Sequence, residues 1–439
     1  MWFGMNREDF VQGLLHYIDS SPTPFHAVAQ ATAELDNSGF ARLDEVSAWD
    51  LSSTDRFYLT RGDSSLIAIV VGQKPPQDGG LRIVAAHTDS PNLRVKPLPA
   101  RRQHGYQQLA IEVYGSPLWS TWLDRDLSLA GRVWLDDGKQ QPTSKLVKFE
   151  RPLLRIPNLA IHLNRAVNSE GLKLNSQQHL VPVIGLESGA SIDIQALLLK
   201  ELSGEVATAS AAKVHGWDLA LYDCQPSTLG GASAEFVFAP RLDDLAGCFA
   251  GLTALLHASS SALTRVLVLY DHEECGSGSV VGADSSFVRD VLQRVLAGCS
   301  NGSSEAWSRT MANSACMSVD MAHAVHPNYP DMHEPGHRPV LGGGPVVKTN
   351  ANQSYATDGE GWARLSVLAQ SNDIHLQHFV SRSDLPCGGT VGPLIAAWLG
   401  VRTVDIGSPM LAMHSVREMV AGSDVHQLAN LVQAFFEDL

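Results

Sequence analysis

The chain has 439 residues, of which 44% are hydrophobic, and a net charge of −14 at neutral pH. This length predicts two domains, or one domain with a large insertion. The negative charge argues against nucleic acid or an anionic membrane as the main partner, and an acidic ligand would need a local cation.

The first residues and the cysteines indicate a cytoplasmic protein. The opening stretch MWFGMNREDF lacks a basic segment followed by an unbroken apolar run, so we predict no signal peptide. We also predict no transmembrane helix, because no run approaches 18 apolar residues. The six cysteines are scattered and form no CxxC pair, which is typical of thiols in a reducing compartment.

The first 92 residues combine helical and strand patterns. Residues 6–18 have helical periodicity, and Thr23 with Pro24 opens a second predicted helix that ends at Gly39. Strand-like runs follow at residues 57–60, 66–71 and 81–86, and the last leads directly into His87.

Residues 93–238 are expected to form a mostly β insertion. Strand-like runs are separated by turn residues, and residues 192–202 form the one clear helix. The runs lie at residues 109–114, 132–135 and 159–163.

From residue 239 onwards strands alternate with helices. Thr357 with Glu360 forms a capping-box pattern, and a Gly-rich helix start lies at 388–392. The predicted helices are 244–257, 286–296 and one from Asp424, and the predicted strands are 266–270, 316–319, 374–380 and 402–406. We therefore predict an α/β fold with a mostly parallel central sheet flanked by helices, built from residues 1–92 and 239–439.

Acids and a histidine follow several of the predicted strands. His87, Glu273, Glu274 and Asp320 each come at the end of an apolar run, and Asp243 enters a helix. Open α/β sheets bind ligands at the carboxyl ends of their strands, so these side chains could converge.

Each of these residues also has a structural interpretation. A lone histidine is usually structural, and adjacent acids usually lie in an exposed turn. However, two carboxylates that leave the buried strand 266–270 are costly without a compensating cation or proton. Histidine nitrogens and carboxylate oxygens suit zinc, manganese or cobalt, and two ions about 3.5–4 Å apart can share a carboxylate and a water.

Seven strings along the chain resemble the aspartyl aminopeptidases, and they occur in the order found in that family. They are HTDSPNLRVKP (87–97), LAIHLNR (159–165), RLDDL (241–245), DHEECGSGS (271–279), SVDMAHAVHPNY (318–329), GPVVKTNANQSYAT (344–357) and MHSVRE (413–418). One departure is the second acid of the pair at 243–244, which is often asparagine in the family. The resemblance implies a dinuclear metalloaminopeptidase whose β-rich insertion is a dimerisation domain.

The resemblance also implies two divalent metal ions per subunit, zinc before manganese or cobalt. His87, Asp243 and Asp320 would hold one ion. Asp243, Glu274 and His414 would hold the other, so that Asp243 bridges the pair.

The remaining roles implied by the family concern catalysis and substrate. Glu273 would be the base that activates a metal-bridging water, Asp89 would orient the His87 imidazole, and Tyr355 would donate a hydrogen bond to the oxyanion. Lys348 would pair with the acidic side chain of an N-terminal Asp or Glu, although most lysines are simply solvated.

Assembly follows from the same resemblance. His162 would lie near a neighbouring subunit's active site, although it could be an ordinary strand histidine. The family's usual assembly is a tetrahedral dodecamer. The substrates would be peptides with a free N-terminus.

Two other functions are compatible with the sequence. One is a dimetal aminopeptidase of neutral or broad specificity, which Lys348→Met would distinguish because only acidic substrates should suffer. The other is a large scaffold with a vestigial site, which would assemble and bind without metal.

Overall fold

The computed structural model describes residues 5–52, 54–136, 141–203, 213–259, 262–299 and 305–438. The chain divides into two compact units. The first comprises Met1–Asp89, Ser227–Met413 and Glu418–Leu439, and the second comprises Ser90–Pro226 and His414–Arg417. Within the described ranges, no helix is both long enough and apolar enough to cross a membrane.

The first unit is built around a nine-stranded sheet of order β1-β2-β3-β13-β4-β14-β18-β16-β17. The four central strands β13, β4, β14 and β18 run parallel, and antiparallel pairs lie on either side. The strands are β1 (Ala41–Arg42), β2 (Arg56–Arg61), β3 (Ser65–Val70), β4 (Leu81–His87), β13 (Thr264–Tyr270), β14 (Ala315–Val319), β16 (Val346–Lys348), β17 (Gln377–Phe379) and β18 (Arg402–Gly407).

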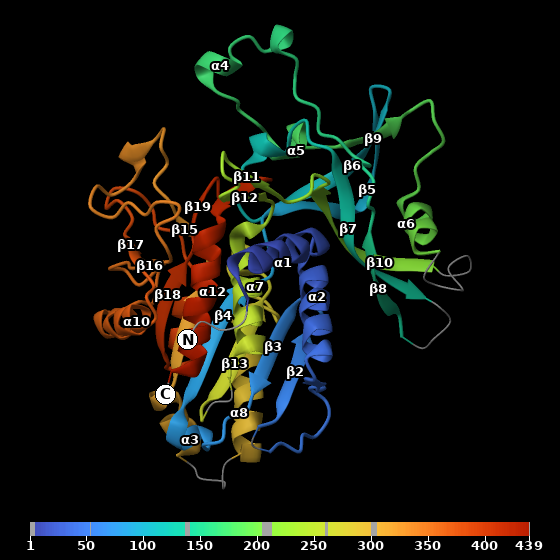
Figure 1. The fold of residues 1–439 in the computed structure, drawn as a ribbon. Helices are drawn as coiled ribbons and strands as arrows, with labels where there is room; N and C mark the ends of the chain where they lie inside the picture. The colour runs from blue at the N-terminus through green and yellow to red at the C-terminus, as the bar shows by residue number, and fades with distance from the viewer. Residues whose placement is uncertain are drawn as a thin grey trace. The chain divides into compact units, whose positions relative to one another are not determined.

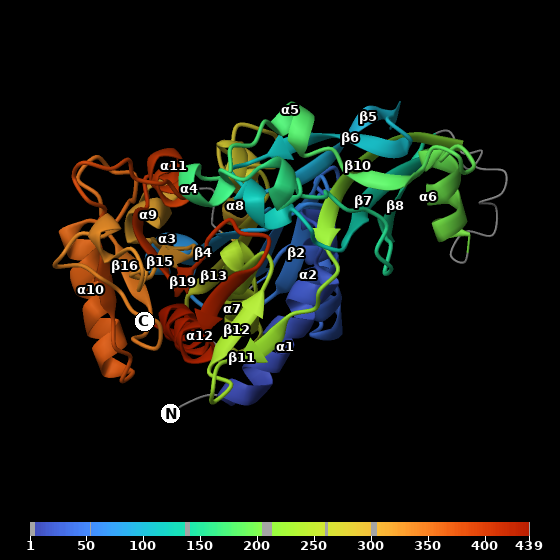
Figure 2. The same ribbon diagram turned by 90° about the horizontal axis from the view of Figure 1, so that it is seen from above.

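Helices cover both faces of this sheet because its strands are apolar on both sides (Figures 1 and 2). On β13, Leu267 and Leu269 pack into a core with α1, α2, α7 and α12, whereas Val266 and Val268 pack into a second core with α8 and α11. The helices are α1 (Arg7–Ser20), α2 (Pro24–Asn37), α3 (Pro76–Gly79), α7 (Leu242–His257), α8 (Phe287–Cys299), α9 (Ala306–Asn313), α10 (Gly359–Ser371), α11 (Gly392–Leu399) and α12 (Gly422–Glu437). The predicted α/β architecture is therefore confirmed.

A smaller five-stranded sheet completes the first unit, in the order β11-β12-β20-β19-β15. Its strands are β11 (Thr228–Gly230), β12 (Phe236–Ala239), β15 (Ala322–His323), β19 (Pro409–Leu411) and β20 (Glu418–Ala421). Residues 227–238 were expected in the insertion, but β12 pairs antiparallel with β20 and so belongs to the first unit.

The second unit contains an antiparallel sheet of order β8-β7-β10-β5-β6-β9. Its strands are β5 (Asn92–Gln103), β6 (Tyr106–Tyr114), β7 (Leu127–Asp136), β8 (Thr143–Lys148), β9 (Val183–Leu186) and β10 (Lys213–Asp223), and its helices are α4 (Val167–Glu170), α5 (Ser176–His179) and α6 (Ile194–Leu202). Helix α6 packs Leu198 and Leu202 into the core of this unit.

Two local predictions were wrong. Leu159–Leu163 is not a strand: Ile161–Leu163 forms a 3₁₀ helix whose apolar side chains are exposed, so the alternating pattern had no buried face to line. Thr357 does not cap α10, because Asp358 accepts the Gly361 amide instead and the Thr357 hydroxyl accepts the amide of Asp405.

Candidate active site

Three neighbouring parallel strands of the first unit deliver most of the predicted site residues to one edge of the sheet. His87 is the last residue of β4, and it pairs with Tyr270 at the end of β13. A short 3₁₀ turn, Glu273–Cys275, follows β13, and Asp320 follows β14. These strand ends therefore meet, as parallel topology requires.

The His87 imidazole lies among carboxylates. Its Nε2 atom is 3.4 Å from Asp243 Oδ1 and 4.0 Å from Asp320 Oδ1. Donor atoms of these three buried residues all lie within 4.8 Å of one another, and the same holds for His87 with Glu273 and Glu274. One nitrogen with several oxygens is a donor set that fits zinc.

The acids in this cluster cannot all ionise cheaply without a cation. Burial, with repulsion from Asp243, raises the pKa of Asp320 to about 7 against the opposing influence of Lys348. Burial raises the pKa of Glu273 to about 8, with Asp320 and Glu274 adding to it. A divalent cation would favour the ionised forms, so the electrostatics fit a metal site.

The charge of His87 depends on competing influences. Burial opposes the imidazolium, but hydrogen bonds with Asp243 and Asp89 outweigh it and raise the pKa of His87 well above its usual range. A bound metal would instead require the neutral ring.

Asp89 touches both the histidine and the predicted base. The His87 Nδ1 atom is 3.0 Å from the Asp89 carbonyl oxygen and 3.4 Å from its carboxylate. The two carboxylate oxygens accept the backbone amides of Glu273 and Glu274, each at 3.1 Å. Asp89 therefore fixes the turn that carries both glutamates as well as contacting the imidazole.

Three further buried residues support the cluster, and the sequence assigned none of them a role. Asp244 accepts the His87 amide at 3.3 Å, and Glu418 accepts the Asp243 amide at 3.2 Å. The Cys248 thiol donates to the His87 carbonyl at 2.9 Å. The only available signal was the unusual placement of acids in apolar surroundings, such as Asp244 at the start of α7.

Lys348 is buried beside the cluster. Its Nζ atom donates to the Met321 carbonyl at 3.0 Å and lies 3.5 Å from Asp320 Oδ2. It also lies 5.2 Å from the centre of the Tyr355 ring. The lysine is thus not a solvated one, and it neutralises part of the acidic cluster.

Tyr355 is buried with Phe379, at 6.4 Å between ring centres. Burial, followed by the neighbouring Cys387, raises the pKa of the Tyr355 phenol well above its usual range. The phenol therefore remains protonated and can donate a hydrogen bond. His323 stacks edge-on against the same Phe379 ring at 5.6 Å, and the sequence did not single it out.

Two predicted site residues belong to the second unit. His162 lies in the exposed 3₁₀ turn. His414 has its Nδ1 atom 3.1 Å from the Ser116 carbonyl, and its own carbonyl accepts the Leu118 amide at 2.9 Å. Their roles at a metal or substrate stay predictions.

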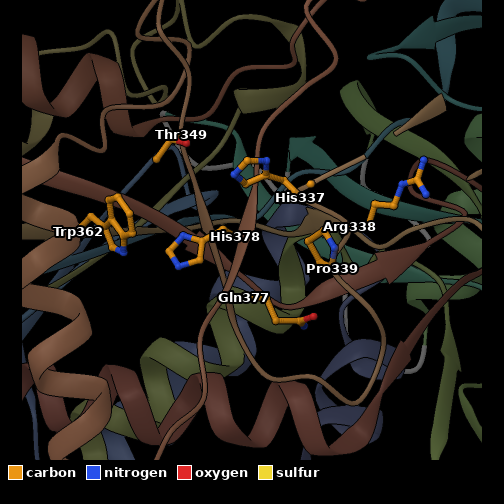
Figure 3. Close-up of a pocket in the computed structure, with 8 residues that line it drawn as sticks. His337, Arg338, Pro339, Thr349, Trp362, Gln377 and His378 are labelled. Carbon is orange, nitrogen blue, oxygen red and sulfur yellow. The ribbon is translucent and has the colours of Figure 1, made fainter. Parts of the chain in front are cut away.

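A cavity of about 390 Å³ lies beside β16 and β17 (Figure 3). It is lined by Gly336–Pro339, Thr349, Trp362, Gln377 and His378. Thr349 and His378 line this cavity, whereas their chain neighbours Lys348 and Phe379 lie beside Tyr355. None of the described residues that line it carries a carboxylate or belongs to the acidic cluster.

Comparison with known proteins gives consistent matches. The sequence model of the family described as aminopeptidase I zinc metalloprotease (M18) matches residues 17–436. A protein of Ectopseudomonas mendocina (strain ymp), called probable M18 family aminopeptidase 2, is 46% identical over 432 residues, which is 98% of each chain. The cryo-EM structure of the Ape4 and Nbr1 complex contains a chain that is 39% identical with a TM-score of 0.94, covering 98% of this chain and 86% of that one. The structure of the S. cerevisiae mApe1 dodecamer gives 29% identity and a TM-score of 0.85, covering 98% and 97%.

Proposed function

Because the chain belongs to the M18 family of aminopeptidase I zinc metalloproteases, we propose that it removes an N-terminal Asp or Glu from peptides. Membership makes it a metalloaminopeptidase, and the acidic preference is the proposed refinement. The observation that carries the proposal is the buried cluster of His87, Asp243 and Asp320 with the Lys348 cation beside it.

The donor set supports two divalent ions, with zinc as the family metal. His87, Asp243 and Asp320 would hold one ion, and Asp243, Glu274 and His414 the other. When bound, such ions would supply Lewis-acid chemistry, polarising a substrate carbonyl and making a coordinated water more acidic.

The protein's own groups would then handle the protons and the developing charge. The Glu273 carboxylate would accept the proton of the attacking water and return it to the leaving amine, a role that requires the ionised form that a bound cation favours. The Tyr355 phenol would donate a hydrogen bond to the carbonyl oxygen as it becomes an oxyanion. Asp89 would hold the turn that carries Glu273.

Lys348 is the cation that an acidic substrate side chain needs in a protein of net charge −14. Its 3.5 Å separation from Asp320 also suggests a second role, that of stabilising a metal ligand. The two roles differ in their consequences, because only the first depends on the substrate's side chain.

We also propose a homo-oligomer, in which the β-rich unit mediates dimerisation and His162 approaches a neighbour's active site. The similar S. cerevisiae mApe1 is a dodecamer, which supports the same assembly here. All six cysteines lie within the described residues and none of them forms a disulfide, which supports a cytoplasmic location.

The decisive experiment measures initial rates on Asp-, Glu-, Leu- and Lys-para-nitroanilides. Chelated protein is compared with protein reloaded with zinc, manganese or cobalt. The proposal requires that only loaded protein cleaves and that Asp or Glu leads. If Leu leads, the neutral-specificity alternative replaces the acidic preference, and if no metal restores cleavage, the scaffold with a vestigial site becomes the better explanation.

A further inference from the structure

Asp405 lies outside the acidic cluster, yet it is completely buried in β18. Both of its carboxylate oxygens accept hydrogen bonds. Oδ2 accepts the backbone amide of Ala356 at 2.6 Å, and Oδ1 accepts the Thr390 hydroxyl at 2.6 Å. Its own amide donates to the Thr357 hydroxyl at 2.8 Å.

These bonds converge on the segment that carries Tyr355. Ala356 and Thr357 directly follow that tyrosine, and both are anchored to the single residue Asp405. Asp405 is itself held in place, because its strand β18 is paired with β14 on one side and with β16 on the other. Asp405 also pairs in register with Lys348 on β16.

The surroundings hold the carboxylate in one orientation. A β-carbon at Gly392 would come within 2.5 Å of Asp405 Oδ2, so the start of α11 lies directly against that oxygen. Because the Asp405 carboxylate is fully buried and accepts short hydrogen bonds from an amide and a hydroxyl, the position of Ala356 is costly to change.

We propose that Asp405 is a positioning residue that holds the Tyr355 phenol where it stabilises the oxyanion. The proposal rests on the function proposed above. Asp405 acts on Tyr355 rather than on Lys348, because the lysine is held separately by Met321 and Asp320 whereas the tyrosine segment is bonded to Asp405 itself.

The test uses Asp405→Ala in the metal-loaded enzyme. A small misplacement of an oxyanion donor should lower kcat by about 10–100-fold, less than the loss of about 100–1000-fold expected for Tyr355→Phe. Because the tyrosine acts on the carbonyl, Asp- and Leu-para-nitroanilide should lose the same factor, with KM nearly unchanged.

Two conservative variants give the test a second arm that does not depend on the alanine variant folding. Asp405→Asn can present its amide oxygen to Ala356 and its NH₂ group to Thr390, so it should restore most of kcat. Thr357→Val keeps the side-chain shape but removes the acceptor of the Asp405 amide, so it should lower kcat.

A matched control is Asp424→Ala. Asp424 is also a fully buried acid of the first unit that accepts two backbone amides, those of Gly342 and Gly344. Its removal should lower thermal stability but leave kcat close to normal.

A double-variant cycle separates this proposal from the proposed function. In a Tyr355→Phe background, Asp405→Ala should change kcat by no more than about twofold, since its effect passes through the tyrosine. Slow turnover in Tyr355→Phe with normal turnover in Asp405→Ala and Thr357→Val would overturn the role of Asp405 alone. A full, additive loss in the double variant would also overturn it, whereas normal turnover in Tyr355→Phe would remove the tyrosine's role and this proposal together.

Discussion

The two units differ in net charge and in how many acidic side chains they bury. The second unit has 16 lysines and arginines against 13 acids, a net charge of +3, whereas the first has 16 against 33, a net charge of −17. Among the described residues of the second unit, Asp223 is the one buried acid, and it forms an ion pair with Arg125.

The first unit buries several acids around His87, with Lys348 as the neighbouring buried lysine. The buried acids of this unit are Asp89, Asp243, Asp244, Asp271, Asp320, Asp405, Glu418 and Asp424. The second unit thus pairs its buried acid with an arginine, whereas the first unit gathers several acids around His87 and Lys348, an arrangement that fits cation binding.

The largest effect is expected for Glu273→Gln. An amide cannot accept the proton of the attacking water, so kcat should fall by about 10²–10⁴-fold while bound metal stays the same. Turnover and metal content are measured on the same sample. Asp223→Asn in the second unit is the control that should leave kcat unchanged, and near-normal rates in metal-loaded Glu273→Gln would contradict the assignment of the base.

Lys348→Met should come next. Loss of the cation should raise the activation free energy that corresponds to kcat/KM by about 2–4 kcal/mol for Asp and Glu substrates. The same quantity should barely change for Leu substrates. Lys74→Met, which changes an exposed lysine of the same unit, provides the control. An equal loss for Leu substrates, together with reduced metal content, would instead show that Lys348 acts by stabilising Asp320.

Metal removal should make the stability of the first unit depend on pH. The pKa of Asp320 is raised to about 7 and that of Glu273 to about 8, above the value near 4 that an unfolded carboxyl has. Between about pH 4 and about pH 8 the folded chain binds more protons than the unfolded chain. The free energy of unfolding therefore decreases as pH rises through this range. Thermal unfolding of chelated and metal-loaded protein should therefore diverge towards high pH, and a gap independent of pH would contradict the cluster's electrostatics.

The smallest effect is expected in the second unit. Arg125→Met leaves the buried Asp223 without its cation, but the arginine side chain is 28% exposed, so solvent offsets part of the loss. We expect about 1–2 kcal/mol lower stability, measured by denaturant unfolding, with kcat unchanged at low temperature. A loss of turnover before unfolding would show that this pair matters for catalysis as well.

Much of the first unit could be predicted because its signals are local. The apolar run before Glu273 predicted β13, and acids at strand ends predicted the cluster, since parallel strands share an edge. The prediction of a strand at residues 159–163 was wrong because alternating apolar residues do not by themselves provide a partner strand.

The remaining features depend on contacts between distant segments. No pattern near β12 (Phe236–Ala239) reveals that it pairs with β20, and none near His414 reveals that four residues return to the second unit. The roles of Asp405 and Glu418 were not predicted for the same reason. In the sequence, a buried acid that accepts hydrogen bonds from the backbone amides of remote loops cannot be told from any other acid.

The insertion between β4 and β13 also dictates the order in which the chain can be completed during synthesis. Strand β4 lies between β13 and β14, so after residue 87 has been made, both of its edges lack partners until residues 264–270 and 315–319 exist. The six strands of the second unit, in contrast, all emerge between residues 92 and 223 and can pair at once. Domains fold as units during translation, so the part of the protein that begins first finishes last, and its open strand edges are where a nascent chain would need protection.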